Sequence, residues 1–190
     1  MKTLILLITT FTLFFGCNTE NKKETATKPL SQPELVERGN YLVNTIGCAD
    51  CHSPKTFGPS GPMIDPNTHL GGHIDGDVTE RVNKEALQNW VLFNMSNTAT
   101  VGPWGISYAA NISSDATGIG NWTEKQFFSA MREGWFKGLA DSRKLLPPMP
   151  WENYKNMTDE DLRAIFAFLK STKPVSNIVP PPVNPDNLRR

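Results

Sequence analysis

The sequence lacks an excess of either charge. Its 190 residues include 19 Lys and Arg and 19 Asp and Glu, so the formal net charge is zero at pH 7. Proteins that bind nucleic acids neutralise phosphates with a concentrated basic face, and this sequence shows none. We therefore expect no nucleic-acid partner, and any electrostatic docking surface must come from local patches.

The sequence also lacks an apolar run of the roughly 20 residues that a membrane-spanning helix needs. The apolar run from Leu4 to Phe15 is shorter and is interrupted by threonines, which predicts an export signal over residues 1–16. The run ends at Cys17 in a pattern that resembles a bacterial lipobox, so Cys17 is the expected site of lipid attachment. An uncleaved hydrophobic anchor is the alternative. We expect an exported, membrane-anchored lipoprotein that faces the periplasm, with residues 17–30 as its lipid anchor and flexible tether.

Only three cysteines occur in the chain, and two of them lie in the segment Cys48-Ala49-Asp50-Cys51-His52. Two thiols separated by two residues and followed by His have the spacing that lets both sulfurs form thioethers to haem vinyl groups while the imidazole ligates iron. On a helical turn, thiols three positions apart lie on one side. The motif therefore predicts one haem c, bound covalently through Cys48 and Cys51, with His52 as an iron ligand. No cysteine is then left for a disulfide.

Two other kinds of site use a Cys-x-x-Cys spacing. A structural zinc site needs two further ligands with matching spacing, and the sequence has no second Cys pair. A thioredoxin-like redox pair occurs in a βαβ context, which the helical periodicity of this chain does not support. Haem attachment is therefore favoured over both.

Apolar periodicity and capping patterns predict a chain of helices and loops. We expect four helices. The first begins at the capping residue Ser31 and runs into the Cys motif, and the second runs from Lys84 to about Met95. The third begins at Thr123 and ends near Gly134, and the fourth begins at Thr158 and stops before Lys173. A high density of Pro and Gly predicts a loop between Ser53 and Thr79. Residues 174–190 are rich in proline and are expected to form an extended tail. The predicted fold class is all-α, with about four helices and little regular sheet.

The second axial ligand must be a Met or His that follows the motif. Four methionines are less suitable because they are expected in helices, beside a helix cap or too close to the motif: Met131, Met95, Met157 and Met63. Met149 lies in Leu-Pro-Pro-Met-Pro-Trp, where the prolines favour a rigid, extended loop that can hold a thioether against iron. We predict Met149 as the ligand and keep His69 and His73 as alternatives.

The order of these features is similar to that of the class I cytochromes c. The common features are an N-terminal helix with Gly39, the Cys-x-x-Cys-His turn, a late Met loop and a C-terminal helix with aromatic residues. Within that class, the stretch from Asn111 to Thr123 and the segment Pro148-Met149-Pro150-Trp151 look like the haem subunits of alcohol-type and related periplasmic dehydrogenases. The resemblance covers roughly Glu34 to Pro182. Those subunits commonly carry several haem motifs, whereas this chain has one.

The resemblance implies a loop-rich all-α cytochrome c domain over residues 31–173, with its first and last helices crossing beside the haem. It implies that Gly39 allows a close approach to the face of Phe166 and Leu169. It also implies that a proline carbonyl in the loop after the motif accepts a hydrogen bond from the second imidazole nitrogen of His52, and Pro62 is the candidate.

Further side chains are candidates for contact with a haem. Several aromatic residues are expected in loops and have polar tips that need partners when buried, although ordinary core packing accounts for them equally well: Trp104, Trp122, Trp151 and Tyr154. Arg143, just before the Met loop, is a candidate partner for a haem propionate.

With both axial positions filled, the iron offers no site for a substrate, so we expect single-electron transfer and no catalysis. The expected partners are a donor dehydrogenase, an acceptor oxidase or other respiratory complex, and the membrane through lipid at Cys17. The polar tether favours a mobile carrier. A haem subunit fixed in a dehydrogenase or oxidase complex is an alternative, as is a haem sensor or catalyst with an open iron position.

Overall fold

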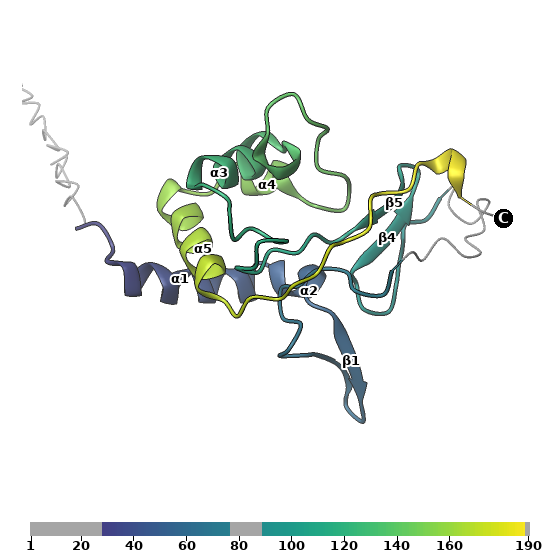
Figure 1. Ribbon diagram of the computed structural model, residues 1–190, viewed down its shortest axis with the longest axis horizontal. Helices are drawn as coiled ribbons and strands as arrows, with labels where there is room; N and C mark the ends of the chain where they lie inside the picture. Colours follow the sequence, from purple (N-terminus) through teal and green to yellow (C-terminus); the bar gives the residue numbers. More distant parts are fainter. Residues whose placement is uncertain (1–27, 77–88, 189–190) are drawn as a thin grey trace, which may run out of the picture.

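The computed structural model describes residues 28–76 and 89–188. Its elements in chain order are α1 (Gln32–Thr45), α2 (Cys48–His52), β1 (Lys55–Gly58), β2 (Gly61–Ile64), β3 (Leu92–Phe93), β4 (Ala99–Gly102), β5 (Gly105–Tyr108), α3 (Glu124–Glu133), η2 (Phe136–Gly138), α4 (Trp151–Tyr154), α5 (Asp159–Ser171) and η3 (Pro185–Asn187). The longer helices gather at one end, the strands β4 and β5 lie at the other, and α2 lies between them (Figure 1).

The expectation of an all-α fold is wrong. The described part of the chain contains five α-helices and five strands, arranged as a β1–β2 hairpin and an antiparallel β3–β4–β5 sheet. The hairpin lies within the segment that was expected to be loop only. Each strand is two to four residues long, so it is too short to show the alternation of apolar and polar residues by which strands are recognised.

The prediction of a helix from Lys84 to about Met95 is also wrong for those of its residues that the structure describes. Residues 84–88 lie outside the described residues, and Leu92 and Phe93 form β3, paired with Val101 and Thr100 of β4. The pairing to a distant strand, which the local pattern does not contain, decides the conformation here.

Three predicted helix starts are confirmed. The Glu34 carboxylate accepts a hydrogen bond from the backbone N–H of Ser31 at 2.7 Å, in the predicted capping box of α1. Thr123 forms a capping box with Gln126 at the start of α3, and the Thr158 hydroxyl accepts from the backbone N–H of Asp161 at 3.1 Å at the start of α5. These interactions satisfy backbone donors that the first turn leaves without helical partners.

Helices α1 and α5 cross closely at Gly39, as predicted, but the facing residues differ. A Cβ at Gly39 would lie 2.0 Å from the carbonyl oxygen of Ala164 and 2.6 Å from Cβ of Phe168. Phe166 instead packs against Phe127 of α3, with 5.2 Å between ring centroids. The residues of α5 nearest to Gly39 are therefore Ala164 and Phe168, one turn apart, in place of the predicted Phe166. Leu169 is buried in the core cluster that also contains Leu42 and Val43 of α1.

The main core lies among α1, α3 and α5 and extends to α2. Its largest fully buried side chains are Val43, Leu70, Ile119, Leu162, Ile165 and Leu169. Partly buried residues of the Cys motif and of the predicted Met loop, Cys48 and Met149, pack against the same cluster. The core thus joins the two segments that the sequence analysis assigned to one site.

The proline-rich tail is extended up to Asn184, where the helical turn η3 begins, and it packs against the rest of the protein. The backbone amide of Val183 donates to Ile106 of β5 at 3.0 Å, and Leu188 is buried beside Ile106. Nearer α5, the side-chain amide of Asn111 donates to the carbonyl of Val175 at 2.7 Å. The tail therefore runs from the end of α5 to the sheet (Figure 1) and links the two ends of the fold.

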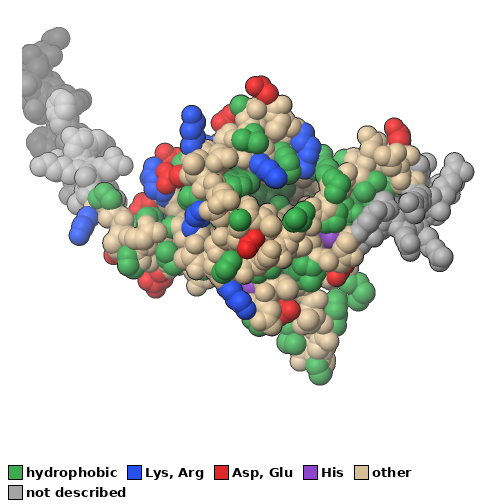
Figure 2. Space-filling view, in the orientation of Figure 1, with side chains coloured by type: hydrophobic (Ala, Val, Ile, Leu, Met, Phe, Trp, Pro, Cys, Tyr) green, Lys and Arg blue, Asp and Glu red, His purple; other side chains and the backbone are tan. Residues whose placement is uncertain are grey.

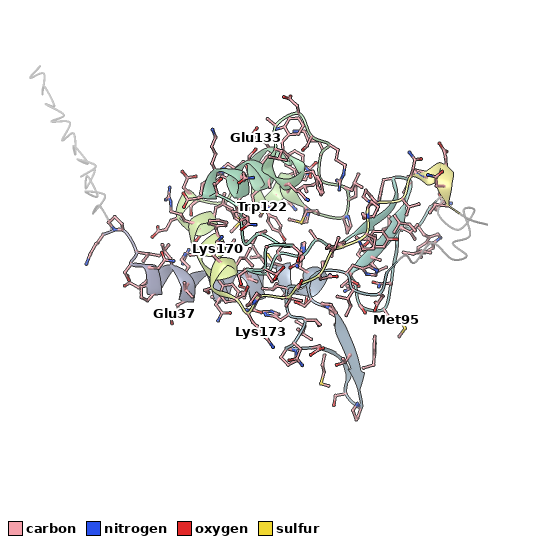
Figure 3. The ribbon with its side chains drawn as sticks, in the orientation of Figure 1. Glu37, Met95, Trp122, Glu133, Lys170 and Lys173 are labelled. Carbon is pink, nitrogen blue, oxygen red and sulfur yellow. The ribbon has the colours of Figure 1, made fainter. Side chains whose placement is uncertain are left out.

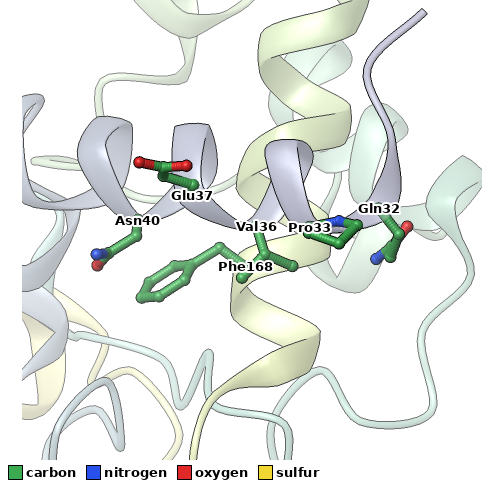
Figure 4. Close-up of a pocket in the computed structure, with 6 residues that line it drawn as sticks. All are labelled: Gln32, Pro33, Val36, Glu37, Asn40 and Phe168. Atoms are coloured by element: carbon green, nitrogen blue, oxygen red, sulfur yellow. The ribbon is translucent and has the colours of Figure 1, made fainter.

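Two surface features stand apart from the core. The β1–β2 hairpin projects from the body and exposes the apolar side chains of Phe57, Met63 and Ile64 (Figure 2). An open hollow lies along the amino-terminal half of α1 and is lined by Gln32, Pro33, Val36, Glu37, Asn40 and Phe168 (Figure 4). It contains none of the predicted haem-binding residues.

The predictions for the amino terminus fall on undescribed residues. The export signal over 1–16, lipid attachment at Cys17 and most of the tether lie outside the described residues. Among residues 28–76 and 89–188, no helix has the length and apolar character that crossing a membrane requires.

Candidate haem-binding site

The Cys motif forms a short helix of its own. Gly47 has a φ of 86° and turns the chain from α1 into α2, which contains the whole Cys48–His52 segment. Both cysteines are free and half-buried, and His52 is buried. The thiols and the imidazole are thus presented by one five-residue helix.

The environment of the thiols does not indicate a reactive redox pair. Burial raises the pKa of Cys48 to about 11 and also raises the pKa of Cys51. Reactive cysteines have a lowered pKa, since the thiolate is the nucleophile. A zinc site is not supported either, because the described residues contain no group of three or more His, Cys, Asp or Glu side chains that could hold a metal ion.

The imidazole of His52 is fixed by a backbone carbonyl that the sequence analysis did not identify. Its Nδ1 lies 2.7 Å from the carbonyl oxygen of Ala110. The prediction of Pro62 as this acceptor is wrong, since Pro62 lies in β2, exposed on the hairpin. Burial lowers the pKa of His52, and the bond to Ala110 acts in the opposite direction. With the proton on Nδ1, the neutral imidazole presents Nε2 to a metal.

Gly72 allows the segment around Ala110 to pass directly behind His52. The amide of Gly72 donates to the carbonyl of His52 at 2.9 Å. Gly72 has a φ of 75°, and a Cβ there would lie 2.5 Å from the carbonyl carbon of Ala110. Any other residue at this position would force the backbone around Ala110 to shift.

The loop that carries Met149 is tied to both ends of the site. On the sheet side, the Ser107 hydroxyl of β5 donates to the carbonyl of Pro147 at 2.6 Å. On the helical side, the Tyr154 hydroxyl donates to the carbonyl of Ile46 at 3.0 Å, two residues before Cys48. Burial, and to a smaller extent the nearby Cys48 and Cys51, raise the pKa of Tyr154 to about 12. The segment that follows Met149 therefore lies close to both thiols.

The other candidates for an axial ligand are less well placed. Both ring nitrogens of His73 are engaged, Nδ1 with the Thr98 hydroxyl at 2.8 Å and Nε2 with the Gly76 carbonyl at 2.7 Å. Met95 is 77% exposed and points away from the molecule (Figure 3). Met63 is 52% exposed on the hairpin, whereas Met131 is buried in the core. His69 is half-buried and remains the alternative to Met149, whose role as ligand stays a prediction.

The remaining sequence candidates have partners within the protein. The indole of Trp104 donates to the Ser107 hydroxyl at 3.2 Å, and Trp122 packs against the main core. The Arg143 guanidinium lies 3.9 Å from the ring centroid of Phe136. Its predicted role as a propionate partner requires it to leave this ring or to use the donors that face away from it.

The segment from Ser107 to Ala110 contacts both halves of the site, and its role was not predicted from the sequence. Ser107 holds the Met loop and Ala110 holds His52. The contact at Ala110 is made by a backbone carbonyl, so its side chain carries no signal of the role. The residues present fit a haem c, because two free thiols and an oriented imidazole share one helical turn beside a Met loop that packs on the same core.

Removing the Tyr154 hydroxyl tests how firmly the Met loop is attached. Tyr154→Phe leaves the half-buried carbonyl of Ile46 without its donor, and we expect the free energy of unfolding to fall by about 1 kcal/mol. Tyr41 is 65% exposed, so Tyr41→Phe is a matched control that we expect to change it by less than about 0.5 kcal/mol. Chemical denaturation measures both. Equal stability of the two variants would show that the hydroxyl does not anchor the loop.

The chain is similar to several curated proteins, although no protein-family model matches it. It is 30% identical over 170 residues to the cytochrome subunit of fructose dehydrogenase from Gluconobacter japonicus, covering 88% of this chain and 28% of that protein. It is 40% identical over 153 residues to the cytochrome c subunit of alcohol dehydrogenase (quinone) from Gluconacetobacter polyoxogenes, covering 80% and 25%. It is 28% identical over 144 residues to the gluconate 2-dehydrogenase cytochrome c subunit of Pantoea cypripedii, covering 75% and 24%.

These three relatives are all named as cytochrome subunits of dehydrogenases, and each is longer than this chain. The chain spans about a quarter of the length of these relatives, whose covered shares are 28%, 25% and 24%. They confirm the resemblance inferred from the sequence, since each is named as a cytochrome subunit of a dehydrogenase.

Proposed function

We propose that this chain, a homologue of the cytochrome c subunits of fructose, alcohol and gluconate dehydrogenases, is a single-haem electron-transfer protein. Haem c is attached to Cys48 and Cys51, and His52 and Met149 ligate its iron. The observation that carries the proposal is the turn α2, which presents two free thiols together with an imidazole oriented by the Ala110 carbonyl. The bound haem supplies a centre that takes up and releases one electron.

The chain itself supplies attachment and fixed ligands. The carbonyl of Ala110 keeps the proton of His52 on Nδ1, so Nε2 is the nitrogen available for iron. Ser107 and Tyr154 restrain the loop of Met149 from its two sides. If His52 and Met149 both held the iron, no position on it would remain for a substrate, and the chain would carry electrons without being an enzyme by itself.

Export and membrane attachment are part of the proposal. An apolar run over residues 4–15 followed by Cys17 supports an exported lipoprotein anchored at Cys17 and facing the periplasm. The electron donor is then a periplasmic or membrane dehydrogenase, and the acceptor is an oxidase or another respiratory complex. The relatives are named as subunits, which favours a second arrangement in which the chain is fixed in a dehydrogenase complex. Co-purification with a dehydrogenase from solubilised membranes distinguishes that arrangement from a mobile carrier.

Covalent haem attachment tests the proposal directly. After expression in a host that matures c-type cytochromes, we expect the intact mass to include one haem that survives denaturation, and the reduced spectrum to show haem c. The double variant Cys48→Ser, Cys51→Ser loses the covalent haem completely, because no thioether can form.

Cys17→Ser is the matched control, since it also removes a thiol but leaves the haem motif intact. We expect it to retain the haem and to lose association with the membrane fraction. Wild-type protein without covalent haem, or a double variant that still carries it, contradicts the proposed function.

A further inference from the structure

Lys55 begins β1 three residues after His52, and its ammonium binds backbone carbonyls. It donates to the carbonyls of Asp50, Ser53 at 3.1 Å and Ser96 at 3.0 Å. None of the ion pairs among the described residues involves Lys55. All three donors of the ammonium are therefore used on carbonyls, and its charge is not neutralised by a direct ion pair.

The three carbonyls come from two separate parts of the fold. Asp50 and Ser53 belong to the end of α2, where carbonyls lack helical partners and a cation is favourable. Ser96 lies between β3 and β4, 41 positions along the chain from Lys55. Lys55 thus fastens the Cys51 end of the haem motif to the turn of the three-stranded sheet.

The charge of Lys55 lies beside the cysteine that the proposed function links to haem. Its ammonium binds the carbonyls of Asp50 and Ser53, which lie on either side of Cys51 and His52 in the chain. Asp50 is exposed, whereas Lys55 is partly buried. Solvent and salt screen a partly buried charge less than an exposed one, so the positive charge is the stronger of the two at Cys51.

We infer that Lys55 is a positioning residue for the haem motif and that its ammonium raises the reduction potential of the haem attached at Cys51. The inference rests on the proposed function. Uptake of an electron removes one positive charge from the redox centre, so a fixed positive charge nearby favours the reduced form. The carbonyl bonds hold that charge at one place beside the motif.

Redox titration of the haem-loaded protein, followed by its optical spectrum, tests the inference. Lys55→Gln keeps a hydrogen-bond donor and removes the charge, and we expect the equilibrium constant for reduction to fall by about three- to tenfold, where tenfold corresponds to 59 mV for one electron. Lys55→Arg keeps the charge and is expected to stay within about twofold of wild type. Asp50→Asn removes the opposing charge, and we expect a smaller shift in the upward direction.

The outcomes separate this inference from the proposed function. Equal potentials for wild type and Lys55→Gln overturn the role of Lys55 while leaving haem attachment established. A potential that falls equally in Lys55→Arg and Lys55→Gln also overturns it, because the charge is then not the cause. If Lys55→Arg matures with haem and Lys55→Gln does not, the cation is required to position the motif, which supports the inference. Wild-type protein without covalent haem refutes the proposed function itself.

Discussion

Met149→Ala is expected to convert the spectrum of the haem-loaded protein from low-spin to high-spin and to let the reduced form bind carbon monoxide. The change removes the thioether of Met149, whose loop is restrained by hydrogen bonds from Ser107 and Tyr154, and alanine offers no ligand atom. We expect the iron to lose this ligand without a replacement, because both ring nitrogens of His73 are engaged and Met95 is exposed, which leaves the half-buried His69 as the alternative to exclude. Optical spectra of both oxidation states, with and without carbon monoxide, measure it.

Met157→Ala is the matched control for this change. Met157 is also partly buried and packs against the same core cluster as Met149, so both variants lose a comparable packing contact of about 2 kcal/mol or more. Only the Met149 variant should change the spin state. A Met149→Ala protein that keeps the wild-type low-spin spectrum shows that another residue ligates the iron, and His69→Ala then identifies or excludes the half-buried histidine.

Local interactions explain which parts of the fold the sequence predicts. The starts of α1, α3 and α5 follow from capping residues that act on amides two or three positions away, as at Thr158 and Asp161. The strands are different, because β3 is only two residues long and exists through pairing with β4. The local sequence at Leu92 and Phe93 does not show that they pair with β4. The apolar periodicity around them therefore led to the wrong prediction of a helix.

The same distinction holds within the site. Cys48, Cys51 and His52 could be predicted as haem-binding residues because haem attachment requires two Cys and a His at fixed, closely spaced positions. Ala110 acts on His52 from 58 positions away through a backbone carbonyl, which every residue type possesses. The acceptor could be found only once the chain path behind Gly72 was known. The prediction of Pro62 as the acceptor rested on the family resemblance, and it was wrong because the resemblance does not give the path of this chain.

The crossing at Gly39 makes the second strong prediction. Gly39→Ala should lower the free energy of unfolding by about 2 kcal/mol, because the new Cβ would lie 2.0 Å from the Ala164 carbonyl oxygen and force α1 and α5 apart. Overpacking of about 3 kcal/mol is offset by about 1 kcal/mol of improved helix propensity. A loss of about 2 kcal/mol lowers the melting temperature of a chain of this size by roughly 4–8 °C, which circular dichroism measures.

Gly58→Ala is the control that separates this contact from a general effect of replacing glycine. Its Cβ would lie 2.7 Å from Cε of Met63, the mobile end of an exposed side chain that can turn away, so we expect less than about 1 kcal/mol of change. Because α1 leads through Gly47 directly into the Cys motif, a separated crossing also displaces α2. Gly39→Ala protein that melts at the wild-type temperature would show that the two helices accommodate a methyl group, and that their close contact is not what holds the haem motif against the core.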